Sequence, residues 1–291
     1  MIEKILFPSK FYESDFSALK SILVLKEVGL KEIVFLYVIE PEAVIVPKTG
    51  EILKEELERL KKLAQVQFEE WIEFLQKFNI NAKSYVLLGE PAEKILELAE
   101  KENVDLVVLN HKKKRNFLKF FITGIGSTVL TLLKIICTPV IIFPYPYEED
   151  ENIFSDVLIA IDFSKNSEEV INYLKNLKPL VKRAVLIHVI ENEEDIDNIE
   201  EVKNKLDEYK NILEKEGINA YHFIYYGKTY EKIIEAAKEH KVKLVAMGIT
   251  GKHEEEKRRF EFIFIGSVTQ KVVDLSDKPV FLVPPKRKIN S

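Results

Sequence analysis

The sequence lacks several features that mark common classes of enzyme and membrane protein. It contains one cysteine, Cys137, which excludes an intrachain disulfide and a zinc site built on several cysteines. It contains no run of about 18 apolar residues, so we expect no transmembrane helix. A phosphate-binding loop of the Gly-x-x-x-x-Gly-Lys type, a Ser-His-Asp triad in a recognisable context and a cluster of metal ligands are all absent. These absences argue against an efficient enzyme.

The net charge and the N-terminal residues bear on two further classes, nucleic-acid-binding proteins and secreted or membrane-associated proteins. The net charge of −5 gives no electrostatic reason to bind nucleic acid. Residues 1–7 lead into an apolar strand without a signal peptide, so we expect a cytoplasmic protein that does not contact a membrane. Cys137 lies in an apolar run before Thr138 and Pro139, and we expect it to be a small core residue.

What the sequence does contain is an internal repeat, and 46% hydrophobic residues over 291 positions are enough for about two domains. Six segments recur in the same order in both halves. The matched segments are 4–11 with 156–163, 34–40 with 185–191, 88–91 with 226–229, 104–110 with 242–248, 126–127 with 266–267, and 138–144 with 278–284. The polar stretch 144–151 predicts a boundary between domains 1–147 and 152–291, which should touch because this linker is short.

Each half alternates short apolar runs with amphipathic stretches. The runs are continuous and rich in Val, Ile and Leu, which is typical of parallel strands buried on both faces. Apolar residues recur at helical spacing in 51–78, 193–216 and 230–240. The pattern predicts an α/β fold of two tandem doubly wound domains, each with five strands in an open parallel sheet and four helices on its two faces.

A glycine motif in the second half is the strongest indication of a binding site. Gly248 and Gly251 follow the apolar strand 244–247, and Gly266-Ser267 open a helix fourteen residues later. Glycine lets a backbone approach a ligand closely, and the N–H groups at a helix start bind anions. Asp162 and Val189 should lie on the same rim, because ligands of such sheets bind beyond the carboxyl ends of the strands.

The first half has lost this motif. Lys10 replaces the aspartate, and Asn110 and Lys113 replace the two glycines, so that only Gly126-Ser127 is retained. A Cβ at both glycine positions would crowd a ligand, and we expect no tight nucleotide site there. The basic segment His111–Arg115 follows on the same rim, where it either captures another anion or forms solvated surface.

These motifs, taken together, resemble the universal stress protein family. The resemblance rests on an aspartate ending the first strand, His-Val-Ile ending the second, Gly-x-x-Gly after the fourth, Gly-Ser at the last helix and Pro-Val opening the fifth strand. It covers nearly the whole chain as two domains in tandem. It implies strand order 3-2-1-4-5 and fifth strands, 140–143 and 280–283, that pair between the domains as an intrachain pseudo-dimer. A homodimer of the whole chain stays open.

The resemblance also implies a ligand for the second half. Many members of the family bind ATP or related adenine nucleotides, and others bind none. We therefore expect ATP, ADP or AMP, with or without Mg²⁺, to be held by phosphate contacts at 266–268, backbone groups of Val189 at the adenine edge and Asp162 at the ribose or adenine. The implied binding residues are Ala160, Ile161, Asp162, Val189, Met247, Gly248, Gly251, Gly266, Ser267 and Val268.

One departure from the family pattern affects the choice of nucleotide. The gap between Gly251 and Gly266 is fourteen residues, against nine in the family. Basic residues in 252–259 would add bonds to phosphates, whereas the glutamates 254–256 would oppose a triphosphate unless a metal intervenes. The leading hypothesis is a regulatory stress-response protein that binds a nucleotide and an unidentified protein partner. A nucleotide-free interaction protein, and a weak ATPase using His253, remain as alternatives.

Overall fold

The computed structural model describes residues 1–46, 50–112, 127–191, 198–250 and 265–285. The strands of the first half are β1 (Lys4–Pro8), β2 (Glu32–Ile39), β3 (Asn81–Leu88), β4 (Leu106–Lys112) and β5 (Val140–Tyr145). Those of the second half are β6 (Asp156–Ala160), β7 (Arg183–Ile190), β8 (Asn219–Tyr226), β9 (Leu244–Gly248) and β10 (Val280–Val283).

Eight α-helices connect these strands within the described residues. They are α1 (Glu13–Ile22), α2 (Lys54–Gln76), α3 (Pro91–Glu102), α4 (Ser127–Leu133), α5 (Lys165–Asn176), α6 (Ile199–Lys215), α7 (Thr229–Glu239) and α9 (Ser267–Leu275), together with the short 3₁₀ helices η1 (Leu23–Val28) and η2 (Pro41–Ala43). None of the described helices combines the length and apolar character that crossing a membrane requires.

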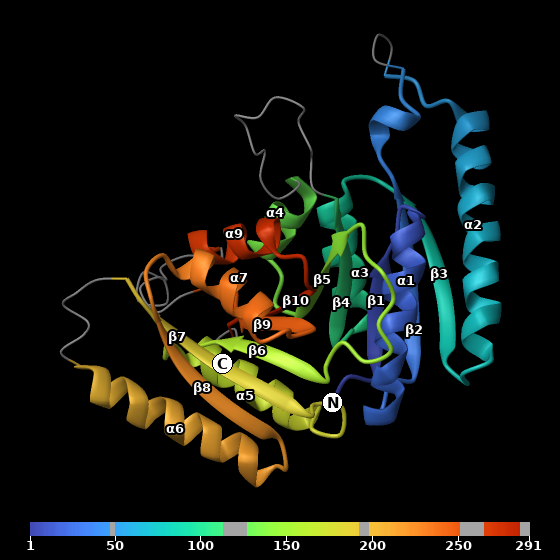
Figure 1. Ribbon diagram of the computed structural model, residues 1–291. Coiled ribbons are helices and arrows are strands. Elements are labelled where there is room, and N and C mark those ends of the chain that lie inside the picture. The colour runs from blue at the N-terminus through green and yellow to red at the C-terminus, as the bar shows by residue number, and fades with distance from the viewer. Residues whose placement is uncertain (47–49, 113–126, 192–197, 251–264, 286–291) are drawn as a thin grey trace, which may run out of the picture.

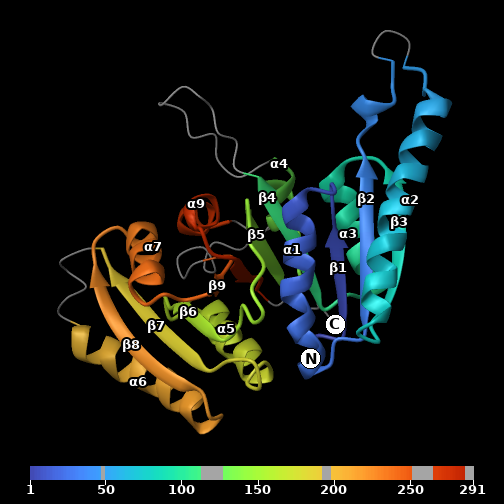
Figure 2. The same cartoon turned by 45° about the vertical axis from the view of Figure 1, so that its right-hand side comes forward.

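All ten strands belong to one sheet, in the order β3-β2-β1-β4-β5-β10-β9-β6-β7-β8 (Figures 1 and 2). Each half therefore has the expected 3-2-1-4-5 order, and the pairs within each half are parallel. The prediction of two tandem doubly wound α/β domains is confirmed.

The two halves join through their fifth strands. β5 and β10 are antiparallel, with Phe281 opposite Ile141 and Leu282 opposite Val140. Each strand would otherwise be an apolar edge open to unwanted pairing, and joining them covers both edges. The predicted intrachain pseudo-dimer is thus present in the fold.

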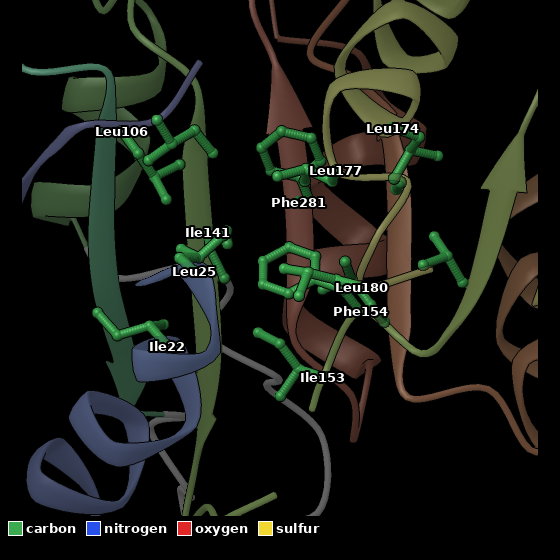
Figure 3. Packing of buried hydrophobic residues seen from close by; sticks show 14 of the residues in the cluster. Ile22, Leu25, Leu106, Ile141, Ile153, Phe154, Leu174, Leu177, Leu180 and Phe281 are labelled. Carbon is green, nitrogen blue, oxygen red and sulfur yellow. The ribbon is translucent and has the colours of Figure 1, made fainter. Parts of the chain in front are cut away.

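Helices cover both faces of the sheet. Buried side chains of α1, α2, α5 and α6 pack on one face, and those of α3, α4, α7 and α9 pack on the other. This arrangement explains the continuous apolar runs, because strands buried on both faces cannot alternate apolar and polar residues. One cluster runs across the boundary between the halves (Figure 3) and includes Ile22, Leu25, Ile141, Ile153, Phe154 and Phe281.

The linker is bonded to both halves. The backbone N–H of Asp150 donates to Ser21 Oγ of α1 at 2.8 Å, and Lys243 Nζ just before β9 donates to Asp150 Oδ1 at 2.8 Å. The ring of Tyr147 lies edge-on to Phe143 at 4.7 Å between centroids. We retain 1–147 and 152–291 as the proposed domain limits, with the linker acting as a structured joint between them.

Two residues of the first half lie differently from the sequence-based expectation. Cys137 is exposed, because it lies in the connection between α4, which ends at Leu133, and β5. His111 is buried, with 3% of its surface exposed, because β4 continues through it instead of ending in a solvated loop. Its Nε2 lies 3.3 Å from Asp274 Oδ1 of α9, in the other half. Lys113–Arg115 lie outside the described residues.

A network of charged side chains lies at the start of β1, β2 and β3 and at the end of α3. Lys83 Nζ lies 2.6 Å from Glu102 Oε2 and 2.9 Å from Glu32 Oε1, and the Tyr85 hydroxyl donates to Glu102 Oε1 at 2.6 Å. Burial opposes the charge on Glu102, but the hydrogen bonds from Lys83 and Tyr85 outweigh it and lower the pKa of Glu102 to about 2.

Because this pKa lies below the value of 4.5 for a free glutamate, the network stabilises the fold fully above that value. The stabilisation is lost as the pH falls through the folded pKa. We expect Glu102→Gln to lower the free energy of unfolding at pH 7 by about 1–2 kcal/mol and to flatten the acid limb of the stability profile. Urea unfolding at several pH values measures the free energy of unfolding and its pH dependence.

Glu97→Gln, on the exposed side of α3, is the matched control and should change stability by less than about 0.5 kcal/mol. Equal losses in the two variants would contradict the prediction.

Candidate functional site

A cavity of about 620 Å³ lies at the carboxyl ends of β6, β7 and β9, beside the first turn of α9. Nine of the ten residues predicted from the sequence line it, namely Ala160, Ile161, Asp162, Val189, Met247, Gly248, Gly266, Ser267 and Val268. The tenth, Gly251, lies outside the described residues, as do His253 and the rest of the insertion up to 264. The fold therefore brings together residues from four separate segments of the second half.

The turn after β6 presents Asp162 to this cavity. Asp162 Oδ1 accepts hydrogen bonds from the Ser164 N–H at 3.0 Å and from Ser167 Oγ at 2.5 Å. Ser164 is the N-cap of α5 and accepts from the Ser167 N–H at 3.3 Å. Between them, Phe163 has a φ of 59°, in the left-handed region that a bulky residue rarely adopts. The carboxylate is thus fixed by a tight, strained turn at the start of α5.

Aromatic and apolar side chains form the wall next to this turn. His188 Nδ1 lies 2.7 Å from the carbonyl oxygen of Ile161. The Phe163 ring packs on the His188 ring at 4.7 Å and stacks on Tyr209 at 6.3 Å between centroids. Lys205 Nζ lies 5.5 Å from the centre of the Phe163 ring. Further apolar lining comes from Ile187, Val202, Ile233 and Met247.

Gly248 is required by packing against α5. A Cβ built on this residue would lie 2.7 Å from Asn166 Cβ, closer than real Cβ atoms approach one another. Asn166 is 1% exposed, and its Nδ2 donates to both the carbonyl oxygen, at 3.1 Å, and the hydroxyl of Thr250. Gly248 has no positive φ, so glycine is needed here for its lack of a side chain and not for its backbone conformation. Asn166 is a residue that the sequence analysis missed.

The first turn of α9 forms the opposite end of the cavity. Gly266 is the N-cap, with φ −60° and ψ 140°, and has no side-chain cap. Its N–H donates to the Ile249 carbonyl oxygen at 3.2 Å, and Thr269 Oγ1 donates to the same oxygen at 3.1 Å. The following N–H groups of the turn have no helical acceptor and carry the positive end of the helix dipole. This end of the cavity suits an anion.

Polar residues that follow β7 or belong to α6 and α7 also line the cavity, and the sequence analysis missed them too. Glu191 Oε1 accepts from the Thr229 N–H at 2.6 Å and from Thr229 Oγ1 at 2.5 Å. These bonds lower the pKa of Glu191, and they hold its carboxylate at the start of α7. Glu201 and Lys205 of α6 form an ion pair at 2.6 Å. No group of three or more His, Cys, Asp or Glu in the described part of the chain is arranged to hold a metal by itself.

The equivalent place in the first half has the same turn but different side chains. Phe11 has the same φ of 59°, and its ring stacks on Tyr37 at 5.2 Å. Lys10 Nζ, where the second half has the Asp162 carboxylate, forms an ion pair with Glu40 at 2.5 Å. Asn110 fills the position of Gly248, and its Nδ2 donates to Asp15 Oδ1 at 2.7 Å.

The carboxylate of Asp15 belongs to this internal network. It accepts from Ser9 Oγ at 2.6 Å and from the Lys10 N–H at 3.1 Å, and burial raises its pKa. Ser14 stands where the second half has Asn166, and its smaller side chain accompanies the larger Asn110. The Asp15 carboxylate, the Asn110 amide nitrogen and the Lys10 ammonium group on this rim thus bond to other protein groups, and the lack of a tight nucleotide site there stays a prediction.

Comparison with known proteins agrees with this architecture. The model of the universal stress protein family matches residues 1–144 and again 154–284. The chain belongs to the universal stress protein family. Universal stress protein MJ0577 of Methanocaldococcus jannaschii is 29% identical over 163 residues, covering 46% of this chain and 96% of the relative. That relative therefore corresponds in length to one of the two halves.

Solved structures support the tandem fold. A universal stress protein from Archaeoglobus fulgidus has a TM-score of 0.73 and 22% identity, covering 97% of this chain and 98% of that one. A Pseudomonas aeruginosa protein of unknown function has a TM-score of 0.65 and 14% identity, covering 98% and 93% of the two chains. At these identities the likeness concerns the fold alone. The fold over nearly the whole of this chain is therefore shared with these two structures.

Proposed function

We propose that the second half binds one adenine nucleotide per chain and that the protein is a regulatory nucleotide-binding member of its family. One observation carries the proposal. Nine of the ten residues that the family resemblance implies come from four separated segments, and they line one cavity that ends at the first turn of α9.

The chemistry of the cavity suits the three parts of a nucleotide. A volume of 620 Å³ falls within the usual range of about 300–1,000 Å³ for small-molecule sites. The apolar side chains of Ala160, Ile187 and Met247 would flank a base, and the Asp162 carboxylate would accept a hydrogen bond from a ribose hydroxyl or the base. The backbone N–H groups of the α9 turn would bind phosphate oxygens.

Charge at the mouth bears on the form of the ligand. Asp162, Glu191 and Glu201 line the cavity together with one described lysine, Lys205. Carboxylates near a polyphosphate weaken its binding unless a cation lies between them, so we propose that ATP binds more tightly with Mg²⁺ than without it. Each contribution described here binds or orients a nucleotide, and we therefore propose regulation of a protein partner in preference to rapid ATP turnover.

Substitution of Ser267 tests the proposed phosphate end. Ser267→Pro removes both the hydroxyl and one N–H, yet the helix should tolerate it, because proline suits the first helical position and Gly266 already has an extended ψ. Ser267→Ala removes the hydroxyl alone. We expect the proline variant to bind ATP about 10–100-fold more weakly, as for the loss of hydrogen bonds to a charged group, and the alanine variant to be weakened less.

Isothermal titration calorimetry with ATP, with and without Mg²⁺, measures these affinities, and circular dichroism verifies that the helices persist. Wild-type affinity in a well-folded Ser267→Pro protein would remove the α9 turn from the proposed site. Failure of wild-type protein to bind any adenine nucleotide at sub-millimolar concentration would favour the nucleotide-free interaction protein.

A further inference from the structure

We propose that His188 is a positioning residue, whose Nδ1–H group holds the turn that presents Asp162 to the cavity. This inference deepens the proposed function and rests on it for its effect on nucleotide affinity. The His188 side chain would act on the nucleotide through the backbone of Ile161, to which it is hydrogen-bonded.

The hydrogen bond identifies the proton-bearing nitrogen of His188. A carbonyl oxygen only accepts hydrogen bonds, so the contact of 2.7 Å with the Ile161 oxygen requires the hydrogen to be on Nδ1. The N–H of Ile161 donates in turn to the Ile187 carbonyl oxygen at 2.8 Å. Both backbone groups of Ile161 are therefore held by β7, one by its main chain and one by the side chain of the next residue.

This restraint lies next to the strained residue of the turn. β6 ends at Ala160, and Phe163 has its φ of 59° only three residues later. The His188 ring packs on the Phe163 ring at 4.7 Å with a tilt of 38°. A positive φ at an aromatic residue persists only where surrounding contacts enforce it. His188 supplies two such contacts, the bond to Ile161 and the packing on Phe163.

The first half has the same turn but holds it with other side chains. Comparing the two halves separates the contribution of the hydrogen bond from that of the ring packing. Tyr37 occupies the place of His188, and its ring still stacks on the strained Phe11. Ser9 occupies the place of Ile161, and its Oγ accepts from the Phe11 N–H at 2.8 Å and donates to Asp15. The first half thus fixes its turn with a local serine. Isoleucine has no hydroxyl, and in the second half the turn is held by the bonds of Asp162 to Ser164 and Ser167 together with the His188 bond to the Ile161 carbonyl oxygen.

Two substitutions distinguish the hydrogen bond from the ring packing. His188→Asn places an amide donor near the position of Nδ1 and removes the ring, whereas His188→Phe keeps a ring and removes the donor. We expect His188→Phe to weaken ATP binding about tenfold and His188→Asn to weaken it by less than about threefold, with similar losses of melting temperature in both. Tyr37→Phe in the first half is the control and should leave ATP affinity unchanged.

Nuclear magnetic resonance of ¹⁵N-labelled protein tests the positioning role without a ligand. Long-range ¹H–¹⁵N spectra should show His188 in the Nδ1–H form, and the backbone shifts of 162–164 should move in His188→Phe and stay close to wild type in His188→Asn. An Nε2–H form, or unchanged shifts in His188→Phe, would overturn the inference. If these shifts behave as expected while wild-type protein binds no nucleotide, the positioning role stands and the proposed function fails. Equal loss of ATP affinity in both variants, with wild-type binding intact, would contradict the inference itself.

Discussion

Replacing Gly248 by asparagine is expected to abolish nucleotide binding in the sub-millimolar range and to lower the free energy of unfolding by about 1–3 kcal/mol. The new Cβ would lie 2.7 Å from Asn166 Cβ, and Asn166 is too deeply buried to move away freely. Displacing it would break its bonds to Thr250, at the end of the rim that lines the cavity. Calorimetric titration with ATP and urea unfolding measure the two effects.

The first half supplies the matched compensating change. Asn110 is accepted there opposite Ser14, so we expect Asn166→Ser to restore most of the stability lost in Gly248→Asn. It should not restore ATP binding, because the bonds from residue 166 to Thr250 at the cavity rim stay broken. Asn110→Gly in the first half is the control that leaves ATP affinity unchanged. A double variant less stable than the sum of its single changes would contradict the packing explanation, and tight ATP binding by Gly248→Asn would contradict the site.

Replacing Phe281 by alanine is expected to lower the free energy of unfolding by about 3–5 kcal/mol. Phe281 is fully buried on β10, pairs in register with Ile141 of β5, and lies edge-on to Tyr173 at 5.9 Å. Because it belongs to the cluster that runs across both halves, its loss should also weaken their cooperativity. We expect one urea transition for wild-type protein and two partly separated transitions for the variant.

Phe223→Ala is the matched control for this change. Phe223 lies on β8, at the far end of the sheet, and is 40% exposed. Its replacement should cost less than about 2 kcal/mol, because a large part of its apolar surface stays in contact with water in the folded protein. A loss below about 1 kcal/mol for Phe281→Ala, or equal losses for the two variants, would show that the β5–β10 junction does not join the halves energetically.

The sequence predicts the fold well because the same order of apolar runs occurs in both halves of the chain. Continuous Val, Ile and Leu runs indicate strands covered on both faces, and each run has a partner in the other half. The family resemblance adds the strand order and the pairing of fifth strands, which local patterns do not contain. Both agree with the sheet order found here.

The rim is predictable for the same reason, but its supporting contacts are not. Asn166 and Thr250 are 84 residues apart, and His188 and Ile161 are 27 apart, so neither bond leaves a periodic trace in the sequence. Glu191 and Thr229 are 38 apart. The expectation of a buried Cys137 was wrong, and His111 belongs to a buried strand and not to a loop, because a helix or strand ended a few residues from where the apolar pattern suggested.

Aligned positions also conceal compensating changes between the halves. Lys4 pairs with Glu32 across β1 and β2 at 3.1 Å, and at the equivalent positions Asp156 pairs with Arg183 at 2.8 Å with the charges exchanged. Each position alone looks like a mismatch in the repeat. Only the register of the two strand pairs shows that the same interaction is kept.

The most direct test of a single nucleotide site in the second half is its stoichiometry. Freshly purified protein is denatured and the released nucleotide is identified by mass spectrometry, and separate nucleotide-free samples of the wild-type, Gly248→Asn and Asn110→Gly forms are titrated with ATP. We predict close to one adenine nucleotide per chain in wild type and Asn110→Gly, and none in Gly248→Asn. Two nucleotides per chain, or none released and none taken up by wild-type protein, would contradict the central claim.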